Sequence, residues 1–141
     1  FAADGSWVFS KTYDERTLTD IENDCKNYDF GGYYTYGADA DPVFMETIEA
    51  LISSLCGEGV DVDLFICPIA PSLYQRISRT DYPIFEETEE FAADLSDRYD
   101  LTLTGSFDPS VYGLRDIDFY DPRHLRTEHF SDVFDLTGGA E

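Results

Sequence analysis

Positive charge is scarce in this sequence of 141 residues, which has 9 lysines and arginines against 30 aspartates and glutamates. Only Lys11 and Lys26 are lysines, and the formal net charge at pH 7 is -21. Such a field repels nucleic acid phosphates and anionic membrane surfaces, so we expect neither as a partner. A solvated acidic surface, as in proteins from saline environments, is the interpretation we prefer to a surface for cations or basic partners.

Long apolar runs and clusters of metal ligands are also lacking. No run reaches the length of a membrane span, so we expect no membrane insertion by this segment. The three cysteines form no CxxC pair and there are only two histidines, which predicts no metal site and no cofactor. No signal peptide is visible, and the chain begins at Phe1 rather than Met, so we expect a processed product or a cut fragment.

Residues 1–40 are predicted to be an irregular N-terminal segment, with a weak helical stripe over 17–28 and a short strand at 7–9. The segment contains an aromatic loop between glycines, and its candidate binding residues are Tyr33, Tyr34 and Tyr36. Tyrosine has both structural and binding uses. The loop is therefore either a packed surface loop or the wall of a cleft for carbohydrate or an aromatic ligand.

Residues 41–141 alternate helical and strand patterns. We predict a helix that Asp41 caps and that Gly57 and Gly59 end, a strand over 60–67, a helix over 83–99, a strand over 101–104 and a last helix from Thr127. The first helix should bury one apolar face, formed by Phe44, Ile48, Leu51, Ile52 and Leu55. This order predicts the α/β class, with a parallel sheet flanked by helices.

A carboxylate precedes a histidine by three residues in the motif Asp121-Pro122-Arg123-His124. A carboxylate can fix the tautomer of an imidazole and stabilise the imidazolium, which is what a general base needs. Ligands of parallel sheets bind beyond the C-terminal ends of the strands. The loops at 68–72 and 106–124 both follow strand ends, so we expect the Asp121–His124 pair at that edge. A histidine near a helix start can instead simply bond a backbone carbonyl and pack.

Three further side chains near this edge have two interpretations each. Ser72 and Ser106 follow strand ends and could be nucleophiles, but we prefer the interpretation that they cap the turns near Leu73 and Asp108. Arg123 is a rare positive charge, which either binds a carboxylated substrate or neutralises local aspartates, as Arg126 also could.

The stretch from Pro42 to Leu136 resembles the C-terminal half of SGNH/GDSL-type hydrolases, and it looks closest to their extracytoplasmic branch of esterase-like and O-acetyl-transfer proteins. The residues that carry the resemblance are the strand 62–67 with Pro68–Pro71, the helix through Phe91 and Leu95, the strand 101–104 and Asp121–His124. The resemblance implies a flavodoxin-like three-layer sandwich, with Asp121 as the orienting residue and His124 as the base. It also implies a periplasmic or extracellular location.

The sequence departs from that family in its other functional motifs. No Gly-Asp-Ser turn follows a strand, since Asp4-Gly5-Ser6 has a different order, and Cys67–Ala70 stands where an oxyanion-hole asparagine is expected. We therefore predict the C-terminal portion of a serine esterase or O-acetyltransferase that acts on an ester, plausibly an acetylated glycan, with its serine outside this chain. The alternatives are a non-catalytic domain of the same fold that binds glycan or protein, and an acidic structural module.

Overall fold

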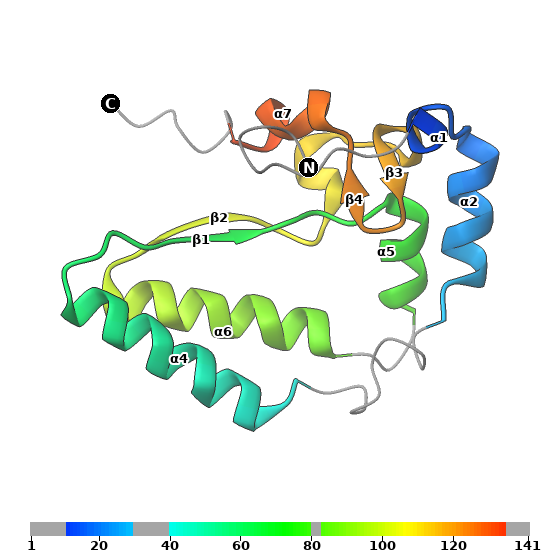
Figure 1. The fold of residues 1–141 in the computed structure, drawn as a ribbon. Helices are drawn as coiled ribbons and strands as arrows, with labels where there is room; N and C mark the ends of the chain where they lie inside the picture. The colour runs from blue at the N-terminus through cyan, green and yellow to red at the C-terminus, as the bar shows by residue number, and fades with distance from the viewer. Residues whose placement is uncertain (1–10, 30–39, 80–82, 135–141) are drawn as a thin grey trace.

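A computed structural model of the chain describes residues 11–29, 40–79 and 83–134 (Figure 1). The strand expected at 7–9 lies outside these residues. The described elements are, in order, α1 (Lys11–Asp14), α2 (Leu18–Asn27), α4 (Pro42–Gly57), β1 (Asp63–Ile66), α5 (Pro71–Ile77), α6 (Ile84–Tyr99), β2 (Thr102–Gly105), η1 (Pro109–Tyr112), η2 (Asp116–Asp118), β3 (Phe119–Asp121), β4 (His124–Leu125), η3 (Thr127–His129) and α7 (Phe130–Phe134). The fold is mixed α/β, as predicted. None of the described helices has the length and apolarity that crossing a membrane requires.

The helix and strand patterns of the central region are confirmed. Asp41 caps α4, with its carboxylate accepting a hydrogen bond from the Val43 amide at 2.9 Å, and Pro42 occupies the first turn. Gly59 has a φ of 76°, which lets the chain turn after α4. The strand predicted over 60–67 is shorter in the structure because only residues 63–66 pair, and the strand predicted over 101–104 is displaced by one residue to 102–105.

β1 and β2 form a parallel two-stranded sheet in which Asp63 pairs with Thr102 and Ile66 with Gly105. The connection between the two strands contains α5 and α6, and α6 contacts both strands. Both α4 and α6 lie on the same side of the strands, below them in Figure 1, whereas α7 and the β3–β4 pair lie above. The loops after β1 and β2 lie side by side, since the Ile69 amide donates to the Phe107 carbonyl at 3.3 Å. The two strand ends therefore form one edge, as expected.

The main hydrophobic core lies beyond this edge, between α2, α5 and the C-terminal elements. Its buried members are Ile21, Cys25, Ile69, Ala70, Leu73, Ile77, Leu114, Phe119, Leu125 and Val133. The weak helical stripe at 17–28 is thus a real helix, because Ile21 and Cys25 are buried, although Leu18 is exposed. The N-terminal helix α2 packs against α5 and η2 and takes part in the same core.

The apolar face predicted for α4 is largely not buried, which corrects that prediction. Only Ile52 is buried, whereas Phe44 is 64% exposed and Leu51 is 54% exposed. The physical reason is that α4 packs against α6, and the described sheet has only two strands for the helices to cover.

Candidate active site

The Asp121–His124 motif is a β-hairpin rather than the loop expected before a helix. Strands β3 and β4 pair antiparallel, with Asp121 opposite His124, and Pro122 and Arg123 make the turn between them. The Asp121 carboxylate closes the turn by accepting hydrogen bonds from the amides of Arg123 at 2.9 Å and His124 at 3.1 Å. An aspartate that bonds the backbone two residues onward is a usual device in tight turns. The turn therefore fixes the carboxylate before it meets the imidazole.

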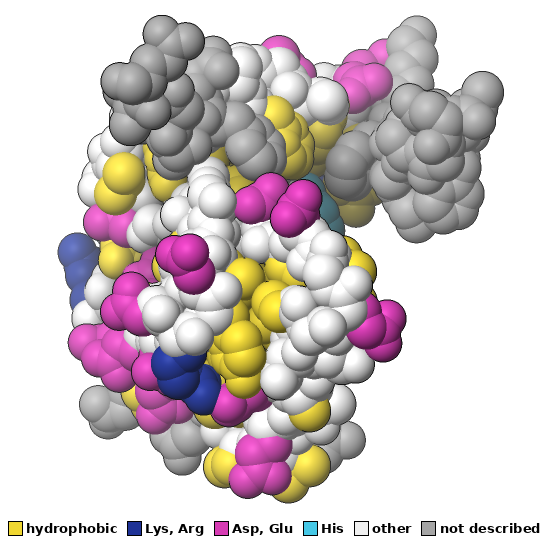
Figure 2. Space-filling view, turned by 90° about the vertical axis from the view of Figure 1, so that its left-hand side faces the viewer, with side chains coloured by type: hydrophobic (Ala, Val, Ile, Leu, Met, Phe, Trp, Pro, Cys, Tyr) yellow, Lys and Arg dark blue, Asp and Glu magenta, His cyan; other side chains and the backbone are white. Residues whose placement is uncertain are grey.

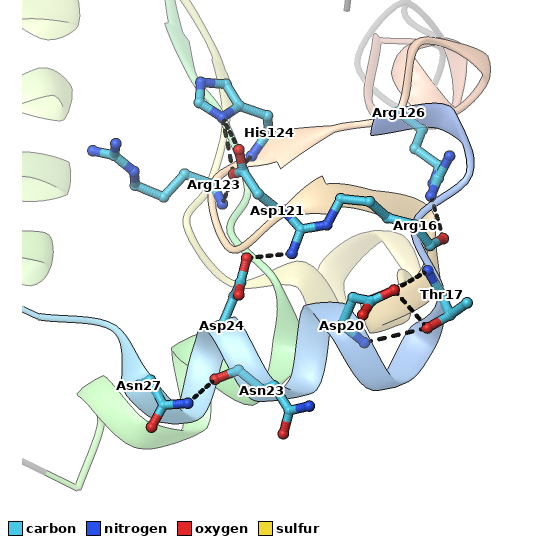
Figure 3. Close-up of polar contacts among 10 residues, drawn as sticks. All are labelled: Arg16, Thr17, Asp20, Asn23, Asp24, Asn27, Asp121, Arg123, His124 and Arg126. Atoms are coloured by element: carbon cyan, nitrogen blue, oxygen red, sulfur yellow. Dashed lines mark hydrogen bonds and ion pairs between the residues drawn. The ribbon is translucent and has the colours of Figure 1, made fainter. Parts of the chain in front are cut away.

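The side chains of Asp121 and His124 are in direct contact (Figure 3). The His124 Nδ1 atom lies 2.9 and 2.8 Å from the two carboxylate oxygens of Asp121. Because an ionised carboxylate only accepts hydrogen bonds, Nδ1 carries the proton in the neutral ring and Nε2 is the basic nitrogen. The His124 side chain is 51% exposed and that of Asp121 only 16%. This geometry suits an oriented base with an accessible ring.

The hairpin is attached to the edge formed by the two parallel strands. The Ala70 amide, just after β1, donates to the Pro122 carbonyl in the hairpin turn at 3.0 Å. Leu125, next to His124, is buried in the main core. The expectation that the Asp121–His124 pair lies at the C-terminal edge of the sheet is therefore confirmed.

Arg126 holds the base of the hairpin from inside the protein, and not by neutralising aspartates as expected. Its guanidinium is buried and donates to the carbonyls of Ile117 at 2.9 Å and Phe119 at 3.2 Å. It also donates to two carbonyls before α2, those of Asp14 at 3.4 Å and Arg16 at 3.2 Å. Five donors in a rigid fork allow arginine to satisfy several carbonyls at once. Sequence reasoning missed this role.

Arg16 brings a second positive charge next to the Asp121–His124 pair. Burial disfavours its charge, but the hydrogen bond and charge of Asp24, with smaller effects from Tyr13 and Asp121, raise the pKa of Arg16. The Arg16 and Asp24 side chains form an ion pair below the hairpin, as Figure 3 shows. Arg16 also lines an open hollow of about 480 Å³ together with Thr12, Tyr13, Glu15 and Asp20. The Arg16 guanidinium is thus a positive charge close enough to Asp121 to interact with it.

The two strand-end serines are both hydrogen-bonded to carboxylates. Ser72 lies in the first turn of α5 and donates to Asp116 at 2.6 Å, so it does not cap the turn near Leu73 as expected. Ser106 donates to Glu89 at 2.8 Å and accepts from the Asp108 amide at 3.1 Å, which confirms the capping interpretation. The structure therefore brings neither serine into a hydrogen bond of the kind that a nucleophile makes with its base.

Of the remaining candidate residues, the structure describes Arg123 but not the aromatic loop. The Arg123 guanidinium lies over the Tyr28 ring, 5.7 Å from its centroid, on the α2 side of the hairpin. The candidate aromatic loop with Tyr33, Tyr34 and Tyr36 lies outside the described residues. Within 11–29, 40–79 and 83–134, no group of three or more histidine, cysteine or acidic side chains could hold a metal ion.

A second histidine–carboxylate cluster lies at the other end of β3, since Asp118 directly precedes this strand and Asp121 ends it. The His129 Nδ1 atom is 2.9 Å from Asp132 and its Nε2 atom is 3.5 Å from Asp118. Burial disfavours ionisation of Asp118, but hydrogen bonds from Arg115 and the charge of His129 outweigh it and lower the pKa of Asp118 below its ordinary 3.8. Both ring nitrogens of His129 face carboxylates, so this histidine is structural.

The lowered pKa of Asp118 predicts that its contribution to the stability of the protein is lost in acid. A carboxyl group whose pKa is lowered by folding stabilises the protein above its unfolded pKa, and this contribution disappears as the pH falls through the folded pKa. The Asp118→Asn variant should therefore be less stable than the natural chain at pH 6, and the difference should shrink as the pH falls below 3.8. Urea unfolding across this range measures it. A difference that is constant with pH would contradict the lowered pKa.

Comparison of the chain with family models, curated proteins and solved structures finds no match.

Proposed function

We propose that this chain provides the base and orienting residues of an SGNH-like acyl-transfer site. The observation that carries the proposal is the contact between Asp121 and the Nδ1 atom of a half-exposed His124 at the end of two parallel strands. The carboxylate sets the tautomer, and Nε2 takes the proton from a serine hydroxyl as it attacks an ester carbonyl. The protein would be a serine esterase or O-acetyltransferase, with an acetylated glycan as the plausible substrate.

The proposal takes two further parts, the full fold and the nucleophile, from the family resemblance of the sequence. The two parallel strands, with α4 and α6 below them, would be part of a flavodoxin-like sandwich, and the attacking serine would come from outside this chain. Ser72 and Ser106 support this assignment, because both hydroxyls are already engaged by acidic side chains. Arg123 and Arg16 would bind a substrate with anionic or hydroxyl groups beside the base.

The second candidate is a non-catalytic glycan-binding domain of the same fold. It is favoured by the same two serines, since a binding domain needs no nucleophile next to His124. Tyr28, with Arg123 over its ring, would offer a stacking surface for a sugar.

Hydrolysis of 4-nitrophenyl acetate by the purified chain tests the role of His124. An exposed, oriented imidazole accepts protons from water without a serine, so we expect a slow rate that falls severalfold in His124→Ala and in Asp121→Asn. His129→Ala is the matched control, because His129 also contacts an aspartate but its side chain is less exposed, at 28% against 51% for His124. Equal rates in the natural chain and in His124→Ala would reject the proposal.

A fluorophosphonate probe locates the nucleophile in the same samples. We expect no labelling of this chain by intact mass, because the serine would lie outside it. Labelling that disappears in His124→Ala would place the serine within these residues and would correct that part of the proposal. Binding of acetylated oligosaccharides with no effect of His124→Ala on hydrolysis would favour the binding domain.

A further inference from the structure

One side of helix α4 exposes large apolar side chains to solvent. Of the seven large hydrophobic side chains that are exposed in the described residues, three belong to this helix, namely Val43 at 70%, Phe44 at 64% and Leu51 at 54%. Contact of such side chains with water is unfavourable. Scattered apolar residues need no explanation, but a set gathered on one helix indicates an interaction site.

The side of α4 that packs against α6 is a different one. Ile52 is buried, Met45 lines an open hollow together with residues of α6, and Glu49 forms an ion pair with α6. At 3.6 residues per turn, these three side chains span about 60° around the helix, and Phe44 and Leu51 point about 110° or more away from their middle. Helix α6 therefore covers only part of the apolar surface of α4.

The exposed side of α4 has a spacing that suits contact with another helix. Its apolar residues follow one another at intervals of four, three and four, which is the spacing of a coiled-coil seam: Phe44, Ile48, Leu51 and Leu55. We call these four residues the α4 seam. A second helix with the same spacing packs into such a seam, whereas the period of two in a β-strand does not match it.

The seam side of α4 is uncharged, in contrast to the rest of this acidic chain. The flank of the seam that points away from α6 has only uncharged residues: Val43, Thr47, Ala50 and Ser54. The charged residues within α4 are Glu46 and Glu49, and at 3.6 residues per turn both point away from the seam. Elsewhere, acidic side chains are spread over the end of the molecule where α4 and α6 finish, and basic ones are few (Figure 2).

This distribution of charge determines which partner fits. The formal net charge of -21 makes one copy of the chain repel another over most of its surface. An uncharged apolar side is where an equally acidic molecule can approach. A basic partner, in contrast, would find no acidic residue beside the seam to select it.

We propose that the α4 seam binds the α4 seam of a second copy of this chain, with the two helices antiparallel about a two-fold axis. A two-fold contact uses the same surface on both copies, so an uncharged apolar seam is its own complement. Antiparallel packing centred between Ile48 and Leu51 sets these two residues against each other, and likewise Phe44 against Leu55. It also places the helix dipoles in the favourable opposite directions.

The ends of such a pair bring like charges together. The same centring sets Asp41 of one copy opposite Glu58 of the other, and both are exposed acids that flank α4. Their repulsion weakens the dimer at low salt, and screening strengthens it. The hairpin with Asp121 and His124 lies across the molecule from α4, as Figure 1 shows, so the dimer leaves the candidate site open.

Sedimentation of the intact chain across about 1 µM to 1 mM tests the contact. We expect the mass to rise from 16.0 kDa toward that of a dimer, and the dissociation constant to fall at least about threefold between about 0.05 and 0.5 M salt. Leu51→Glu should raise the dissociation constant at least about a hundredfold, because it places a charge in the seam twice per dimer. Val111→Glu is the matched control, since it adds the same charge at an exposed apolar residue on η1 and should have an effect of at most about threefold.

Two charge reversals test the antiparallel arrangement. Glu58→Lys should strengthen the dimer at least about fivefold, because it replaces repulsion of Asp41 by attraction at both ends. Glu46→Lys changes the net charge equally but lies on the far side of α4, so its effect should be smaller. A chain that stays at 16.0 kDa at about 1 mM in about 0.5 M salt would overturn the proposal, as would a dimer that salt weakens or equal effects of Leu51→Glu and Val111→Glu. Equal effects of the two charge reversals would overturn the antiparallel arrangement.

Discussion

Gly105→Ala is expected to destabilise the protein by about 3 kcal/mol or more, because two independent strains meet at this residue. Gly105 ends β2 with a φ of 96°, in a region that residues with a side chain rarely adopt. A Cβ atom built there would lie 2.0 Å from the backbone oxygen of Ile66, its pairing partner in β1. A backbone oxygen in a paired strand cannot move aside as the end of a flexible side chain can. The substitution must therefore break the pairing at the end of the sheet.

Two other glycines allow the effect of a positive φ to be measured separately from the effect of a close contact. Gly113 has a φ of 66° but nothing within 4 Å of its would-be Cβ, so Gly113→Ala should cost only about 1 kcal/mol. Gly57 has open space, no left-handed φ and a position in α4, so Gly57→Ala should be neutral or slightly stabilising. Urea unfolding of the three variants gives the comparison. If Gly105→Ala and Gly113→Ala were equally destabilising, the contact with Ile66 would not be tight in solution.

The Gly105 substitution should also affect the candidate site. The loop after Gly105 provides the Phe107 carbonyl that binds the Ile69 amide, and the next residue, Ala70, binds the hairpin turn at Pro122. A displaced strand end therefore changes the support of Asp121 and His124. We expect faster hydrogen exchange of the Ile69 and Ala70 amides in Gly105→Ala but not in Gly57→Ala.

Local patterns in the sequence were sufficient to predict the central helices and strands. Asp41 and Pro42 start α4 by capping and by a fixed φ, and the short strand patterns that alternate with helical patterns pair in parallel at 63–66 and 102–105. The position of the Asp121–His124 pair followed from the same logic, because parallel strands place their C-terminal ends on one edge. The helix and strand predictions held because each depends on residues close together in the chain.

Features that depend on distant partners were not predictable in this way. β3 and β4 have three and two residues, too few for a strand period to appear. The exposure of Phe44 and Leu51 depends on how many strands the helices must cover, which no pattern within α4 reveals. The contact of His129 with Asp118 joins residues in η3 and η2 without a motif between them. One signal for Arg126 was present: it directly follows the apolar Leu125, which lies in the core.

Arg126→Met is expected to destabilise the protein by about 3 kcal/mol, although methionine fills much of the same space. The guanidinium is buried and donates to four carbonyls, those of Asp14, Arg16, Ile117 and Phe119. Removing it leaves these acceptors without a donor where water has little access, which costs more than the bonds themselves contribute. Arg126→Lys should recover only part of the loss, because an ammonium group lacks the planar fork that reaches several carbonyls. Urea unfolding compares the two variants.

Arg98→Met is the control, because Arg98 also pairs with other residues but lies at the surface. Its partners Glu49 and Asp94 are both solvent-accessible, so its loss should change stability little. Equal effects of Arg126→Met and Arg98→Met would mean that the four carbonyls find water and that the buried arginine is dispensable.

Because Arg126 supports the candidate site, hydrogen exchange around that site is a second and more specific test of Arg126→Met. Two of its acceptors precede α2, and the other two flank the start of β3, so the one side chain fixes the distance between Arg16 and the Asp121–His124 hairpin. We expect hydrogen exchange to accelerate in α2 and in β3–β4 together, while α4 and α6 stay protected. The His124 ring resonances should then report a weaker contact with Asp121, because the hairpin that aligns the carboxylate has lost its support. Acceleration spread evenly over α4, α6 and the hairpin would instead show that Arg126 stabilises the whole fold and not the geometry of the site.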